Sequence, residues 1–162
     1  MAAPASPAVL SDDLVRLVES GVMVMVATRD ANLTPECSLS FGARVHADRQ
    51  TVTLYFPEVA NDATRANLLA DGRVAVVMNR PRDEVTVQLK GEFLRLRPMD
   101  SDDLAAHTRC QQNVEAQLIS LGVPPAVCAR FNRGPLVAVD FRARDVFNQT
   151  PGPDAGKRVA TL

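Results

Sequence analysis

The sequence predicts a mainly β fold with peripheral helices, and two observations support this prediction. Six or seven segments have strand patterns, among them the continuously apolar Val22–Ala27 and the alternating Glu36–Val45. Most connections between these segments are short, and short connections require antiparallel pairing. A small antiparallel barrel satisfies both observations, because closure leaves no unpaired sheet edge.

The expected strands differ in how they are buried. Val22–Ala27 and Val74–Met78 are apolar runs typical of strands buried on both faces. Glu36–Val45 alternates, so its side chains fall into two sets. One set is Cys37, Leu39, Phe41 and Ala43, and the other is Ser38, Ser40, Gly42 and Arg44. Further strands are expected at Thr51–Phe56, Val85–Leu89, Phe93–Arg97 and Val137–Ala143, with a bend or bulge at Gly91.

Capping residues and apolar periodicity indicate four helices between and around the strands. The expected helices are one after Ser11 that ends at Gly21, one capped by Asn61 or Asp62 that ends at Asp71-Gly72, one from Ser101–Asp103 to Gly122, and one from Pro124-Pro125 through Phe131. The length of 162 residues favours one domain. We expect a flexible tail over 1–10, the barrel domain over 11–147 and a C-terminal loop or tail over 148–162.

Composition excludes several classes of function. With 18 basic and 19 acidic residues, the net charge of −1 gives no electrostatic footprint for nucleic acid or an anionic membrane. No apolar run approaches the roughly 20 residues of a spanning helix. The three cysteines are widely spaced and odd in number, which favours reduced thiols in a cytoplasmic protein. No Cys or His cluster has the spacing of metal ligands, so no metal is expected.

The order of several short blocks resembles the pyridoxamine 5′-phosphate oxidase-like, FMN-binding split-barrel family. These blocks are Gly21–Thr28, Thr34-Pro35 with Ser38–Arg44, Thr53–Phe56, Thr64–Leu68, Gly72–Val76 and Val87–Gly91. The resemblance extends over most of the chain, and Phe147–Pro153 is similar to the C-terminal phrase of an uncharacterised bacterial branch. It implies an antiparallel split β-barrel and a homodimer that binds FMN in a cleft at the subunit interface. It also implies an oxidoreductase acting on a small molecule.

The resemblance also implies which residues hold the cofactor. Ser38 stands where family members often have a phosphate-binding Arg, and Thr64-Arg65 stand in the Ser-Arg-Lys region at the start of the short helix. Gln88 matches a glutamine used near the flavin ring. The expected cofactor-binding residues are Ser38, Ser40, Arg44, Tyr55, Phe56, Thr64, Arg65 and Gln88. The substrate-binding Arg-x-His near the C-terminus of pyridoxamine phosphate oxidases is absent, so efficient turnover of that substrate is not expected.

Each of these residues also has a simpler interpretation. Ser38, Ser40 and Arg44 line either a cofactor cleft or a solvated strand face, and Arg65 is either a phosphate ligand or an exposed helix residue. His107 lies on an apolar helix stripe, where a packed histidine is expected rather than a haem ligand. Cys37 and Cys110 are expected at core-facing positions as small apolar fillers.

Two classes of function remain. No general acid–base pair and no nucleophile is apparent, which is compatible with a flavin enzyme whose cofactor carries the chemistry. It is equally compatible with a non-catalytic flavin- or haem-binding dimer that acts as a carrier or sensor. No catalytic residue is assigned.

Overall fold

The computed structural model describes residues 9–58, 62–130 and 134–162. The strands are β1 (Met23–Arg29), β2 (Pro35–Ser40), β3 (Ala43–Val45), β4 (Thr51–Pro57), β5 (Arg73–Asn79), β6 (Thr86–Pro98), β7 (Leu136–Asn148) and β8 (Arg158–Thr161). The helices are α1 (Asp12–Glu19), α2 (Asp62–Ala70), α3 (Ser101–Ser120) and α4 (Pro125–Cys128).

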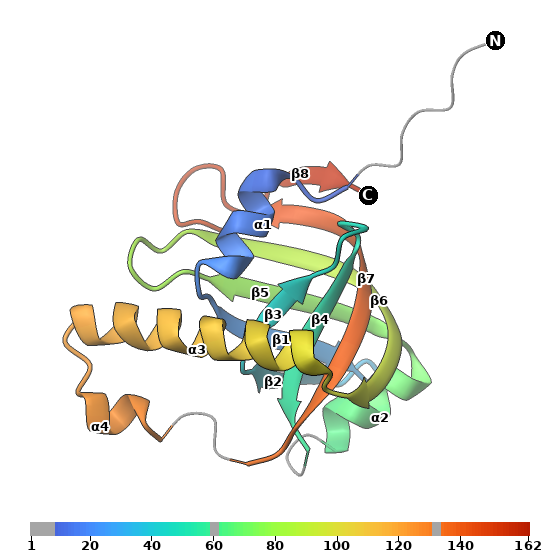
Figure 1. The fold of residues 1–162 in the computed structure, drawn as a ribbon. Coiled ribbons are helices and arrows are strands. Elements are labelled where there is room, and N and C mark those ends of the chain that lie inside the picture. The colour runs from blue at the N-terminus through green and yellow to red at the C-terminus, as the bar shows by residue number, and fades with distance from the viewer. Residues whose placement is uncertain (1–8, 59–61, 131–133) are drawn as a thin grey trace.

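All strand pairs are antiparallel, and they form one sheet in the order β2-β1-β5-β6-β7-β4-β3, with β8 added to β7. The sheet curls around the core, and α3 crosses in front of β3 and β4 (Figure 1). Helix α1 lies at the top of this view, and α2 lies at the lower right. Helices α1 and α3 pack on β3, α2 packs on β1 and β2, and α4 packs on α3. The predicted mainly β fold with peripheral helices is therefore confirmed.

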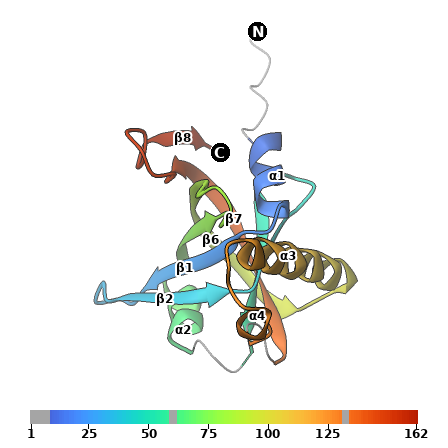
Figure 2. The same cartoon turned by 90° about the vertical axis from the view of Figure 1, so that its left-hand side faces the viewer.

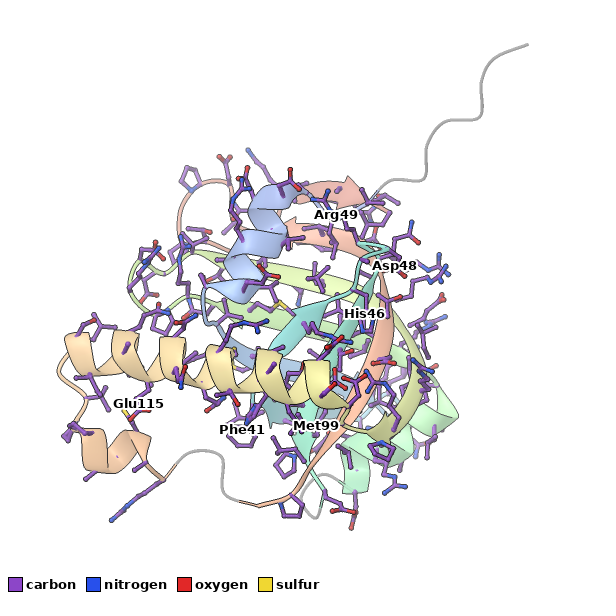
Figure 3. All side chains as sticks on the ribbon, viewed as in Figure 1. Phe41, His46, Asp48, Arg49, Met99 and Glu115 are labelled. Carbon is purple, nitrogen blue, oxygen red and sulfur yellow. The ribbon has the colours of Figure 1, made fainter. Side chains whose placement is uncertain are left out.

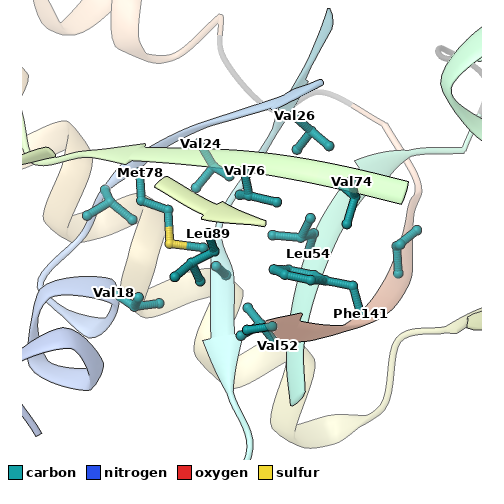
Figure 4. Packing of buried hydrophobic residues seen from close by; sticks show 14 of the residues in the cluster. Val18, Val24, Val26, Val52, Leu54, Val74, Val76, Met78, Leu89 and Phe141 are labelled. Carbon is teal, nitrogen blue, oxygen red and sulfur yellow. The ribbon is translucent and has the colours of Figure 1, made fainter. Parts of the chain in front are cut away.

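Aliphatic side chains from both halves of the sheet meet inside the barrel (Figure 4). Val26, Leu54, Met78 and Leu89 are completely buried there, around the ring of Phe141. The long strands β6 and β7 curve around this core, and their register shifts between Lys90 and Gly91. At Gly91 a Cβ atom would lie 2.1 Å from the carbonyl oxygen of Arg142, so the bulge predicted there requires glycine.

The orientation predicted for β2 is wrong. Ser38 and Ser40 point into the barrel, whereas Cys37 and Leu39 are exposed. The cause is the register with β1, because Ser38 pairs with Val26 and directly opposite residues share a face of the sheet. Cys37 is therefore not a core filler, whereas Cys110 is buried as expected. The solvated-face interpretation is also wrong for both serines.

The exposure of β1 is another difference from the prediction. Its Val24 and Val26 are buried, but Met23 and Met25 keep 37% and 42% of their surface exposed. In one chain the strand is thus buried on one face only. The expected strand over 36–45 is also divided, because Gly42 adopts φ +129° between β2 and β3.

Described residues near both ends of the chain belong to the fold, although the sequence predicted tails there. Leu10, which the sequence placed in the tail, is buried and donates its N–H to the carbonyl of Arg49. Arg158–Thr161 forms β8 on β7, although the composition of 148–158 predicted a loop through the C-terminus. The predicted helix cap at Asn61 and helix end at Phe131 lie outside the described residues.

A buried carboxylate connects three strands. Asp140 of β7 accepts hydrogen bonds from Arg95 Nε (2.7 Å) and Arg97 Nε (3.0 Å) of β6, and from Thr53 Oγ1 (2.6 Å) of β4. Arg97 also donates to Asp103 of α3, whose side chain is fully buried. Burial alone would raise the pKa of Asp140, but the hydrogen bonds from Arg97, Thr53 and Arg95 outweigh it and lower the pKa to about 2.

We expect Asp140→Ala to lower the free energy of unfolding by about 3–5 kcal/mol, because it removes the buried acceptor that Arg95, Arg97 and Thr53 share. Chemical denaturation measures this change. The matched control is Asp102→Ala, which removes an exposed carboxylate that pairs with Arg44 at 3.3 Å. It should change stability by less than about 1 kcal/mol. Equal effects of the two substitutions would contradict the structural role of Asp140.

The same site predicts a pH dependence. The pKa of Asp140 is about 2 in the folded chain, below its ordinary value of 3.8. The unfolded chain therefore takes up this proton first as the pH falls. The contribution of Asp140 is complete above about pH 5 and is lost between there and about pH 2. Asp140→Asn should lack this part of the acid destabilisation, and denaturation at several pH values tests it.

Candidate functional site

The first turn of α2 meets β2 and the end of β4 at a shallow hollow. Four of the eight expected cofactor-binding residues gather here. Ser38 and Thr64 are buried and join β2 to α2 through a hydrogen bond between their hydroxyl groups. Phe56, Thr64 and Arg65 line the hollow, whose volume is about 30 Å³. We refer to Ser38, Phe56, Thr64 and Arg65 as the α2 site.

The charges around the α2 site are mixed. Arg65 is exposed, and it is the one cation among the described residues that line the hollow. The carboxylates of Glu58 and Asp62 line it as well. Because the first N–H groups of a helix lack intrahelical acceptors and carry partial positive charge, this end of α2 favours an anion. The site offers the donors that a phosphate group needs, but two acidic side chains oppose it.

The sequence analysis did not identify the residues that orient α2. Asn67 of α2 is buried and donates from Nδ2 to Thr28 Oγ1 of β1 at 3.1 Å, while Leu68 enters the core. These contacts turn Thr64 toward Ser38 and leave Arg65 facing solvent. A polar residue beside an apolar one inside a helix is the only sequence signal for this role.

Ser40 lies two residues from Ser38 on the same face of β2, but its hydroxyl serves the fold. Its Oγ accepts a hydrogen bond from the backbone N–H of Tyr55 at 3.0 Å. The same Oγ lies 2.9 Å from the carbonyl of Gly42 and 3.1 Å from that of Tyr55. Ser40 therefore ties β2 to β4, where the chain bends at Gly42.

Arg44 and Tyr55 lie away from the α2 site, beneath α3. Arg44 Nε is 3.4 Å from Asp103 Oδ1, and the Tyr55 hydroxyl donates to the same oxygen at 3.5 Å. Burial, followed by the negative charge of Asp103, raises the pKa of Tyr55. The sequence analysis did not identify Asp103 as the shared partner of these residues. Its position at the start of a predicted helix gave no signal for this pairing.

His107 packs as the sequence predicted. Its ring meets that of Tyr55 edge to face, with centroids 5.6 Å apart, and its Nδ1 lies 2.7 Å from the carbonyl oxygen of Phe41. Burial lowers the pKa of His107, although the backbone hydrogen bond to Phe41 opposes the effect. The imidazole is therefore neutral near pH 7 and serves as a packing residue of α3.

Gln88 lies apart from both the α2 site and the residues beneath α3. It is half-buried on β6, where its Oε1 lies 3.4 Å from Nε2 of Gln149. Its register pairs it with Val77 of β5 and Phe147 of β7. Gln88 thus belongs to the outer face of the sheet, and its predicted role near a flavin requires a ligand that reaches this face.

Residues 9–58, 62–130 and 134–162 contain no group of three or more His, Cys, Asp and Glu side chains that could hold a metal ion. In the same ranges, no helix has the length and apolar character needed to span a membrane.

Solved structures share this architecture. HupZ from Group A Streptococcus has a TM-score of 0.56 at 15% identity, covering 91% of this chain and 99% of its own. An F420 reductase has a TM-score of 0.56 at 13% identity, with coverages of 85% and 98%. A general stress protein 26-related protein of the pyridoxinephosphate oxidase family, from Clostridium acetobutylicum, has a TM-score of 0.50 at 14% identity, with coverages of 89% and 90%.

The chain has the split-barrel fold. The resemblance inferred from the short sequence blocks is thereby confirmed at the level of the fold. No family model and no curated protein matches the sequence. With identities of 13–15%, the solved structures establish the architecture, and the function has to be argued from the residues of the site.

Proposed function

We propose that the chain binds FMN and acts as a flavin-dependent oxidoreductase on a small molecule. The observation that carries this proposal is the meeting of Ser38, Thr64 and Arg65 at the first turn of α2. These are the positions that the family resemblance assigns to the phosphate of the cofactor. A split-barrel structure that is named as an F420 reductase supports a redox function for the fold.

The α2 site fits a phosphate group in the kind of donor that it presents. When FMN is bound, the guanidinium of Arg65 would be able to contact two phosphate oxygens, and the hydroxyl of Thr64 and the helix amides would add donors. The carboxylates of Glu58 and Asp62 weaken the site, so we expect lower affinity than a site with several cations provides. When bound, FMN supplies the electron and hydride transfer chemistry.

The role of this chain's residues is to bind and orient the cofactor. Arg65 and Thr64 hold the phosphate, while Ser38 fixes the position of Thr64. Phe56 supplies an apolar wall beside them. A non-catalytic carrier would use the same contacts to bind FMN. If the protein binds FMN but oxidises or reduces no substrate, it is such a carrier. The three free cysteines support our inference of a cytoplasmic protein with reduced thiols.

We also propose that the protein is a homodimer. Met25 of β1 pairs with Leu39 of β2 and Val77 of β5, and these three residues form an apolar row on the outer face of the sheet. Met25 and Leu39 are 42% and 49% exposed in one chain. Gln88 continues the row on β6, so a second copy packed here would lie beside the residue expected near the flavin.

The first prediction concerns Arg65. Because charge-assisted hydrogen bonds contribute roughly 1.5–3 kcal/mol, Arg65→Ala should weaken FMN binding about tenfold to a hundredfold. Riboflavin, which has no phosphate, should bind both proteins with nearly equal affinity. Fluorescence titration of both ligands into both proteins measures this difference.

The control for Arg65→Ala is Arg109→Ala, which removes an exposed arginine of α3. It should leave the affinity for FMN unchanged. If Arg65→Ala and the wild type bind FMN equally, Arg65 is a surface residue and the phosphate is not held at the α2 site.

The second prediction concerns the apolar row. The wild type should be a dimer at micromolar concentration, because stable homodimer interfaces commonly bury more than about 2,000 Å². Met25→Glu should yield monomers, since it places a charge in the row. Light scattering measures both. Leu104→Glu alters an exposed leucine of α3 and should leave the dimer intact. A monomeric wild type would refute the proposal.

A further inference from the structure

A second cavity lies between the hairpin of β1 and β2 and the helices α3 and α4. It has a volume of about 210 Å³. Its apolar lining includes Val22, Val24, Leu39, Val114, Leu118 and Ala129. Helix α4 lies below α3 (Figure 2), and its Cys128 lines the cavity together with Leu39 of β2. The cavity is therefore bounded by the sheet on one side and by helices on the other.

The polar groups beside the cavity are engaged or lie at its rim. Gln111 donates from Nε2 to the carbonyl oxygen of Phe41 at 2.8 Å. The Ser40 hydroxyl is used between β2 and β4. Glu115 is exposed at the side of α3 that faces α4, and Phe41 lies beneath the same helix (Figure 3). A ligand in the cavity would therefore make mainly apolar contacts.

Charge and size limit what the cavity accepts. Its described lining residues include no Lys, Arg or His, and the one charged group is the carboxylate of Glu115. Anionic ligands are therefore disfavoured. The cavity is partly open to solvent, because Leu39 in its lining is 49% exposed and Glu115 lies at its rim. A closed apolar cavity of about 150 Å³ is already large enough to bind benzene. A cavity of about 210 Å³ has room for one ring or a fused pair of rings.

We propose that this cavity is a binding site for an uncharged aromatic molecule of one or two rings. The apolar lining from Val24, Val114 and Leu118 supplies the affinity, and the carboxylate of Glu115 selects against anions. The proposal does not depend on FMN, because none of the four residues of the α2 site lines this cavity.

The test uses indole as the neutral probe and indole-3-acetate as its anionic counterpart, both titrated into the full chain by calorimetry without flavin. Wild-type protein should bind indole, and indole-3-acetate should bind at least about tenfold more weakly. Val114→Phe places a ring in the cavity and should weaken indole binding by about tenfold or more. Ala116→Phe adds the same ring to an exposed position of α3 outside the lining and should change binding by less than about twofold.

Further measurements exclude misfolding of a variant as the cause of weaker indole binding. Circular dichroism and thermal unfolding verify that each variant is folded, and Ala129→Leu fills the cavity from α4 if Val114→Phe does not fold. The proposal is overturned if wild-type protein shows no heat with millimolar indole, or if filling the cavity leaves indole binding unchanged. A third outcome also overturns the proposal. If indole does not bind and Val114→Phe converts a dimer into monomers, the cavity is occupied by a second copy of the chain and not by a small molecule.

Discussion

The buried carboxylate of Asp140 is the constraint on which the arrangement of this protein depends. It lies on β7 and is surrounded by donors from β4 and β6, at 2.6–3.1 Å. A charge with 1% exposure is tolerated only when it is paired and hydrogen-bonded, so these three strands are held in one register. Arg97 extends the network to Asp103 and thereby attaches α3 to the barrel. The placement of α3 over the sheet follows from this attachment.

The network divides the molecule into two functional regions. On the side of α3, Arg44 and Tyr55 are used to hold Asp103, and the helix covers the apolar cavity behind β1 and β2. On the side of α2, Ser38 and Thr64 meet without any of these charges, and Arg65 is left free of the network. The strand β2 joins the regions, since Ser38 faces α2 and Ser40 lies at the cavity. One strand therefore relates the polar site that we propose for the phosphate to an apolar cavity.

Most of the fold could be predicted from the sequence, because periodicity and turn chemistry act locally. The bulge at Gly91 and the start of α1 after Ser11, whose hydroxyl accepts from the backbone N–H of Leu14, are examples. Alternation along β2 divided its side chains correctly but did not show which set faces inward, since that depends on pairing with Val24 and Val26 of β1. Arg44 pairs with Asp103, which is far from it in the sequence. The residues next to Arg44 therefore gave no indication that its side chain lies away from the α2 site.

Whether this chain binds FMN is decided by the cofactor that the purified protein carries. The visible absorption spectrum, followed by mass spectrometry of the molecule released on denaturation, identifies that cofactor. We expect the bands of an oxidised flavin and the mass of FMN, with close to one molecule for each chain. A Soret band with the mass of haem would contradict the account. A colourless protein that also remains colourless after incubation with FMN and removal of the excess would contradict it equally.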